Sequence, residues 1–129
     1  MSNQVCEVQR EHGRLIEILV AAGIAKHSAL VVVAVASAGK AYSAQIEAAA
    51  GLAQPQVSVA LSDLMERKWL TRQAVQREGR GRPVFIYRMR RGMAEVAEAA
   101  QKDLERRRRA LDKDRDELKS AASRLSEKR

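Results

Sequence analysis

Residues 43–70, SAQIEAAAGLAQPQVSVALSDLMERKWL, decide the fold that this 129-residue chain is expected to adopt. We expect Ser43 to cap a short helix that runs to Ala50, because its hydroxyl oxygen can accept a backbone N–H of the first turn. Gly51 follows where a left-handed residue is needed to end that helix. The stretch therefore opens with a short helix that stops at a glycine.

A second helix is predicted to begin three residues after Gly51. Pro55 fits its first turn, where a missing backbone N–H costs nothing, and Trp69 and Leu70 are expected to close it. Its apolar residues form one stripe toward a core: Val57, Ala60, Leu61, Leu64 and Met65. Two helices joined by a short glycine-containing turn predict a helix-turn-helix unit.

Two further helices are predicted upstream of this unit. Residues Glu7 to Ala22 place apolar side chains at helical spacing, and Gly23 stands where a C-terminal cap would. The next segment, Ala25 to Ala38, contains four valines, so a buried strand is an alternative there. Its length and its alanines favour a helix.

A β-hairpin and a long helix are predicted downstream. Leu70 to Gln76 and Val84 to Met89 have strand-like compositions and are separated by the turn-rich residues 78–83. Beyond Gly92 the chain has neither Gly nor Pro and favours one long helix. The predicted fold is mainly α with a small β-hairpin. It is a winged helix-turn-helix domain over residues 1–92, followed by a long C-terminal dimerisation helix over residues 93–129.

The charge distribution favours a polyanionic partner. The net charge is +8, and the window from Glu66 to Gly92 holds nine basic and two acidic residues, so it carries +7 of that charge. A concentrated basic surface attracts phosphate groups over long range and by counterion release. We therefore expect the hairpin region to face a nucleic acid.

Other functional classes find little support in the sequence. Cys6 is the only cysteine, which excludes an intrachain disulfide and favours a reducing compartment, although redox sensing by Cys6 is an alternative. His12 and His27 lack acidic or cysteine partners at metal-ligand spacing. The apolar run Ala29–Ala38 is too short to cross a bilayer. We expect a cytoplasmic protein that is not an enzyme and has no metal, cofactor or evident small-molecule effector.

The chain from Gly23 to Leu70 resembles the DNA-binding domain of the TrmB group of archaeal regulators and, more distantly, MarR-type regulators. The matching positions are Gly23-Ile24-x-Lys26, Gly39, Ile46, Gly51-Leu52, Val57, Leu61, Leu64, Lys68 and Leu70. Glu47 departs from the small residue usual after the isoleucine, where the two helices cross. No large C-terminal sugar-binding domain follows, so the resemblance does not imply sugar sensing. The layout is similar to small archaeal winged-helix regulators that dimerise through a C-terminal helix.

Three sets of residues are predicted to contact double-stranded DNA. A recognition helix would read the major groove, where Gln can bond adenine and Val59 can contact a thymine methyl, with Gln54, Gln56, Ser58, Val59 and Ser62 facing outward. The wing would place arginines in or near a narrow minor groove, namely Arg77, Arg80, Arg82 and Arg88. Phosphate contacts are expected from Lys40, Tyr42, Ser43, Gln45 and Arg72. The alternative for each set is an ordinary solvated surface.

A row of leucines on the last helix predicts a homodimer interface: Leu104, Leu111, Leu118 and Leu125 recur every seven residues. Gln101, Arg108 and Arg115 occupy the companion positions, which argues against a long parallel zipper and favours a shorter or antiparallel packing. The alternative is a helix folded back on its own domain. The basic run 106–109 is expected to be a solvated face, with DNA contact as the alternative.

These features predict a dimeric, sequence-specific DNA-binding transcriptional regulator, with repression by promoter blocking as the simplest mechanism. Two recognition helices of such a dimer meet successive major grooves about 34 Å apart, so the site should be a rough inverted repeat. The alternatives are an architectural protein that coats DNA and a winged-helix module that binds another protein.

Overall fold

Helix α2 (Lys26–Ala38) forms the centre of the fold because its sequence is apolar on nearly every side. All residues from Ser28 to Val35 are buried, so neighbouring elements surround the helix. The computed structural model describes residues 6–76 and 81–127, and within them α1 (Glu7–Ala21), α3 (Ser43–Ala50) and α4 (Gln54–Glu66) pack against α2. The alternative of a buried strand for the valine-rich segment is wrong.

Helices α3 and α4 form the predicted helix-turn-helix. Gly51 ends α3 in the left-handed conformation at φ 67°, and its N–H donates to the Glu47 carbonyl at 2.9 Å. Pro55 lies in the first turn of α4 as expected. Ile46 of α3 and Val57 and Leu61 of α4 are buried, so the apolar sides of both helices meet the core.

The predicted hairpin is part of a three-stranded antiparallel sheet. Strands β2 (Leu70–Val75) and β3 (Val84–Met89) pair over six residues, and β1 (Lys40–Tyr42) pairs with the other edge of β3, giving the order β1-β3-β2. The short strand β1 was not predicted. Its central residue, Ala41, is buried and faces Tyr87 across the pair, which anchors the sheet to the helices.

Two details at helix ends correct the sequence prediction. Ser43 is the first residue of α3 and not its cap; its hydroxyl donates to the Glu47 carboxylate at 3.4 Å, one turn along the helix. Helix α4 ends at Glu66 and not at Trp69, because Lys68 adopts a left-handed conformation at φ 65°. The Trp69 N–H then donates back to the Leu64 carbonyl at 3.1 Å, closing the last turn.

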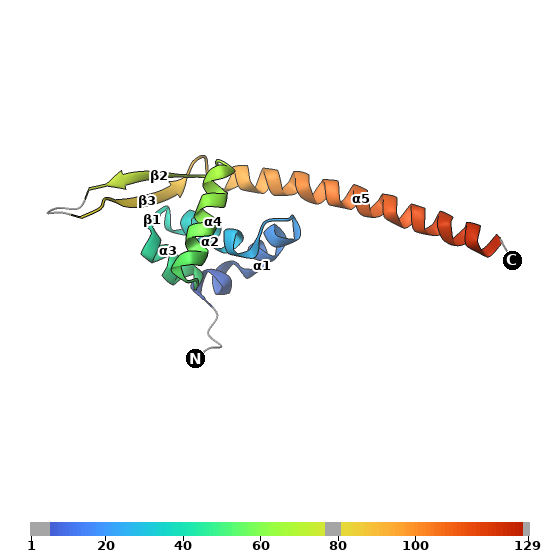
Figure 1. Ribbon diagram of the computed structural model, residues 1–129, viewed down its shortest axis with the longest axis horizontal. Coiled ribbons are helices and arrows are strands. Elements are labelled where there is room, and N and C mark those ends of the chain that lie inside the picture. Colours follow the sequence, from blue (N-terminus) through green and yellow to red (C-terminus); the bar gives the residue numbers. More distant parts are fainter. Residues whose placement is uncertain (1–5, 77–80, 128–129) are drawn as a thin grey trace.

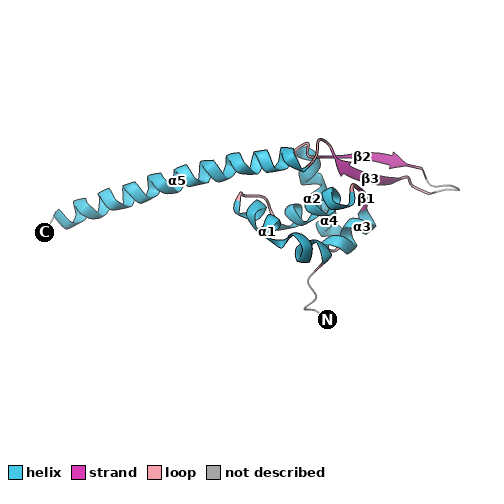
Figure 2. Cartoon of the chain, turned by 180° about the vertical axis from the view of Figure 1, so that it is seen from behind, coloured by secondary structure: helices cyan, strands magenta, loops and turns pink. Residues whose placement is uncertain are grey.

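Helix α5 (Met93–Glu127) leaves the helical cluster and projects far beyond it (Figure 1). Its first turns belong to the core, because Val96 and Ala100 are buried and Leu104 packs against the core. From Glu105 to Glu127 every residue is exposed. Figure 2 shows from behind that the β2–β3 hairpin and α5 extend from opposite ends of the helical cluster.

Candidate nucleic-acid interface

The outward side of α4 carries all five residues predicted for the recognition helix. Val57, Ala60, Leu61 and Leu64 are buried on one side, and Gln54, Gln56, Ser58, Val59 and Ser62 are exposed on the other. Val59 is 72% exposed, which leaves its methyl groups free for contact. Figure 1 shows α4 on the face of the domain turned toward the viewer.

Gln56 has a structural bond as well as an exposed position. Its Oε1 accepts a hydrogen bond from the Ala53 backbone N–H at 2.9 Å, which satisfies one of the free donors at the start of α4. This bond holds the carboxamide at the tip of the helix. The Gln56 Nε2 amino group remains available as a donor. It can donate a hydrogen bond to an acceptor on a base, such as a purine N7.

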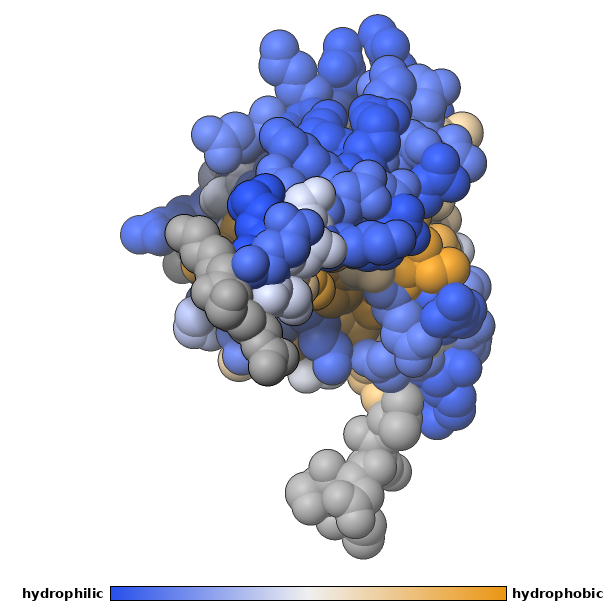
Figure 3. Space-filling view, turned by 90° about the vertical axis from the view of Figure 1, so that its right-hand side faces the viewer, coloured by the Kyte–Doolittle hydropathy of each residue, from blue (hydrophilic) through white to orange (hydrophobic). Residues whose placement is uncertain are grey.

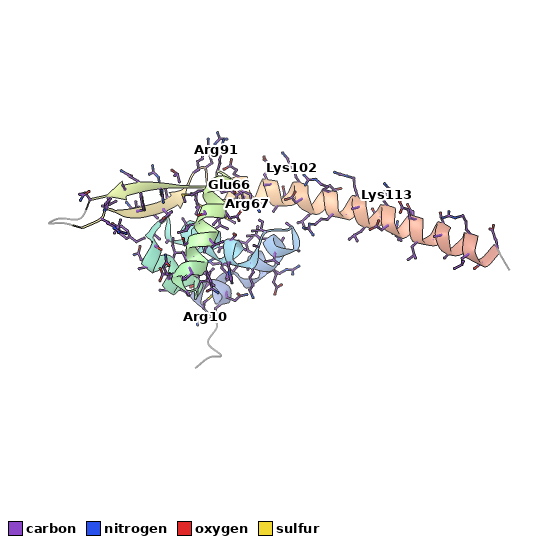
Figure 4. All side chains as sticks on the ribbon, viewed as in Figure 1. Arg10, Glu66, Arg67, Arg91, Lys102 and Lys113 are labelled. Atoms are coloured by element: carbon purple, nitrogen blue, oxygen red, sulfur yellow. The ribbon has the colours of Figure 1, made fainter. Side chains whose placement is uncertain are left out.

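A polar network fixes α4 against α2. The buried Ser28 hydroxyl donates to Asp63 Oδ2 at 2.7 Å, and Arg67 Nε donates to Asp63 Oδ1 at 3.1 Å. The Arg67 guanidinium also lies 5.1 Å from the centre of the Trp69 ring. Figure 4 shows Glu66 and Arg67 at the C-terminal end of α4. The network joins the outward-facing helix to the rest of the domain.

The sheet brings two predicted DNA-contacting cations together. Lys40 and Arg88 are directly paired residues of β1 and β3, so their side chains leave the same face, and both are exposed. Tyr42, the next same-side residue of β1, is also exposed. Like charges directly across a strand pair disfavour the sheet unless a counter-charge lies nearby. No acidic group within 4.0 Å of Lys40 or Arg88 is found in the part of the chain that the structure describes.

Arg72 is separated from this pair. It is opposite Tyr87 on β3, so it belongs to the other face of the sheet, where Tyr87 is buried. Its guanidinium lies 3.9 Å from the centre of the Phe85 ring, a close cation–π contact. The sequence indicated Arg72 and Lys40 as one phosphate-binding set because strand faces cannot be compared before the register is known.

The hairpin tip is described only in part. Arg82 is exposed and follows Gly81, whose φ of 101° is the conformation that glycine favours. Arg77 and Arg80 lie outside the described residues. Arg82 is therefore the tip arginine whose exposure agrees with the predicted wing.

The two remaining predicted phosphate contacts are partly engaged within the fold. Gln45 Oε1 accepts from the Tyr42 backbone N–H at 2.8 Å, which leaves the Gln45 amino group as a donor. The Ser43 hydroxyl is half-buried and donates to Glu47. Glu47, the departure from the resembled family, is thus half-buried and bonded within α3.

The leucine row is mostly solvent-exposed. Leu104 is half-buried against its own domain, whereas Leu111, Leu118 and Leu125 are 67%, 72% and 74% exposed. The alternative that the whole helix folds back on its own domain is wrong. Three large apolar side chains are therefore mostly exposed in the single chain.

Metal-binding clusters and membrane-spanning helices are both absent from the part of the chain that the structure describes. No cluster of three or more His, Cys, Asp or Glu side chains suited to a metal ion occurs within residues 6–76 and 81–127. None of the helices in these ranges combines the length and the apolar character that a membrane span requires.

The order of elements, with a helix-turn-helix followed by a β-hairpin packed beside a third short strand, defines the winged-helix fold. Among solved structures, the chain is similar to a protein described as a possible transcriptional regulator from Methanosarcina mazei Go1. The TM-score is 0.60 and the identity 17%, over 80% of this chain and 87% of the other. The shared fold extends over most of both chains.

Two further solved structures have comparable folds. NadR in complex with 4-hydroxyphenylacetate matches with a TM-score of 0.53 and 18% identity, over 92% of this chain and 84% of that chain. The oxidised form of MarR from E. coli matches with a TM-score of 0.51 and 18% identity, over 74% and 67%. No protein-family model and no curated protein sequence matches the chain. This chain thus has the winged-helix fold found in MarR-family transcriptional regulators.

Proposed function

We propose that this protein is a homodimeric, sequence-specific regulator of transcription that binds double-stranded DNA. The observation that carries the proposal is the outward side of α4, where five short or amide-bearing side chains are exposed on a helix whose other side is buried. A helix presented in this way fits the major groove, which admits an α-helix and displays a distinct pattern for each base pair. The solved structures of similar fold include transcriptional regulators.

The proposed contacts divide into base reading and phosphate binding. Gln54, Gln56, Ser58, Val59 and Ser62 would meet base edges, and Arg77, Arg80 and Arg82 would enter or flank the minor groove. Lys40, Arg88 and Tyr42 form an exposed group on the sheet that suits phosphate, with Ser43, Gln45 and Arg72 as further candidates. A bound phosphate would supply the counter-charge that the Lys40–Arg88 pair lacks.

The proposed function also includes how the protein assembles and whether it represses or activates. We assign residues 1–92 to DNA binding and residues 93–129 to dimerisation, supported by the exposed leucines of α5. Repression by blocking a promoter is proposed because it requires only DNA occupancy. The Gly23-Ile24-x-Lys26 pattern supports the small TrmB-type regulators as a functional comparison.

Selection of bound sequences from a random DNA pool at physiological salt tests the proposal. We expect a rough inverted repeat with A·T-rich flanks, and a defined footprint at that site. Gln56→Ala and Val59→Ala should each weaken the selected site by about 1–3 kcal/mol per lost base contact, with little effect on unrelated DNA. Arg124→Ala, near the far end of α5, is the matched control. Uniform protection without a motif would contradict the proposal and indicate a DNA-coating protein.

A further inference from the structure

Most of helix α5 lies beyond its own domain and receives no packing support from it. Residues 105–127 extend for about 34 Å without burial, although most of the stability of helices in proteins comes from packing an apolar face against other elements. Pairs such as Arg108–Glu105 at 3.2 Å stabilise the helix locally by a few tenths of a kcal/mol each. These ion pairs do not account for the exposure of Leu111, Leu118 and Leu125.

The leucine row continues the side of α5 that is buried at its start. A seven-residue spacing returns each leucine to almost the same side of a 3.6-residue helix. Beside it, a groove of about 470 Å³ is lined by Ala21 of α1 and by Leu104, Arg107, Arg108, Ala110 and Leu111 of α5. In Figure 3, which faces the C-terminal side, an orange hydrophobic patch lies among the blue side chains.

The charges along α5 indicate how a second helix can lie on this row. Residues 106–109 are four consecutive arginines, and residues 112–117 contain four acidic and two basic side chains, giving a net charge of −2. A parallel, in-register partner would place the two arginine runs together and would face Arg108 and Arg115 with their own copies. An antiparallel partner crossing near residues 111–114 places each arginine run opposite residues 116–119 of the other copy, which include Asp116 and Glu117.

We infer that a second copy of this chain pairs with α5 in the antiparallel sense, crossing between Leu111 and Asp114. The partner's Leu118 then occupies the groove between Leu104 and Leu111, and by symmetry the groove of the partner receives Leu118. This arrangement covers the exposed leucines and joins opposite charges across the same seam. The inference rests on the homodimer of the proposed function and specifies its geometry.

Distances between spin labels in the full-length chain test the orientation. A single cysteine replaces Ser126 in a Cys6→Ser background, so that each dimer carries one label on each α5. The antiparallel pair separates the two positions by about 40 Å, from 14 residues on each side of the crossing at 1.5 Å per residue. A parallel pair, with helix axes 8–10 Å apart, holds them within about 20 Å. Lys113→Cys, near the crossing, should give a short distance of about 20–25 Å.

A long distance at Ser126 together with a short distance at Lys113 supports the inference, and a short distance at both positions overturns it. Leu118→Gln should weaken dimerisation at least tenfold in sedimentation equilibrium, whereas the control Gln73→Ala, at an exposed position of β2, leaves it unchanged. A monomer at micromolar concentration also overturns the inference. DNA binding by the same labelled protein separates the outcomes: retained binding to the selected site leaves the proposed function standing when the orientation is wrong.

Discussion

Replacing Arg88 by alanine should make the free protein slightly more stable and make it bind DNA less tightly. Arg88 and Lys40 are directly opposed on the exposed face of the sheet, with Cβ atoms of such pairs about 5 Å apart. Their long side chains diverge in water and salt screens them, so the repulsion relieved is only about 0.2–0.5 kcal/mol. The affinity for DNA should fall, because Arg88→Ala removes a phosphate contact in each subunit.

The salt dependence of binding gives the magnitude. Each phosphate contact contributes about 0.9 to the slope of log K against log salt concentration, so two lost contacts in a dimer reduce the slope by about 1.8. Fluorescence anisotropy on the selected site between 50 and about 300 mM salt measures the slope, and urea unfolding measures the stability. Arg124→Ala, near the far end of α5, is the control and should leave the slope unchanged. An unaltered slope for Arg88→Ala, or a clear loss of stability, would refute the reasoning.

Three further predictions concern the scaffold that presents α4. Gly51→Ala should destabilise the fold by about 2 kcal/mol or more, because φ is positive and an added Cβ would lie 2.8 Å from Cys6 Cβ; an unchanged melting temperature would contradict this. Lys68→Gly should stabilise the fold by about 0.5–1 kcal/mol by relieving left-handed strain, measured as a higher urea midpoint, and a lower midpoint would exclude strain at this residue. Ser28→Ala should cost about 1–2 kcal/mol through loss of its 2.7 Å bond to Asp63. Its effect should be non-additive with Asp63→Asn in a double-mutant cycle, and additivity would show that the bond is energetically silent.

Local patterns were sufficient for most elements. Gly51 and Pro55 mark the turn because their backbone preferences operate over two or three residues, and the structure confirms both. The valine-rich segment was ambiguous because a fully buried helix and a fully buried strand are both apolar on all sides. Surrounding elements resolve it as a helix.

The candidate interface was predictable only in part. The exposed side of α4 follows from helical periodicity, and its five predicted residues are all exposed. The short strand β1 has only three residues and no periodic signal of its own, so the placement of Lys40 beside Arg88 escaped prediction. The placement of Arg72 on the opposite face escaped it for the same reason.

The sequence by itself determined the helix-turn-helix, the hairpin and the leucine row, because each depends on short-range backbone preferences or on the period of one element. The tertiary structure alone decided which charges meet and which apolar side chains remain uncovered. Strand pairing between β1 and β3 joins residues far apart in the chain, and the burial of α5 ends at the edge of its own domain. Both depend on how the elements pack together, which no single stretch of sequence specifies.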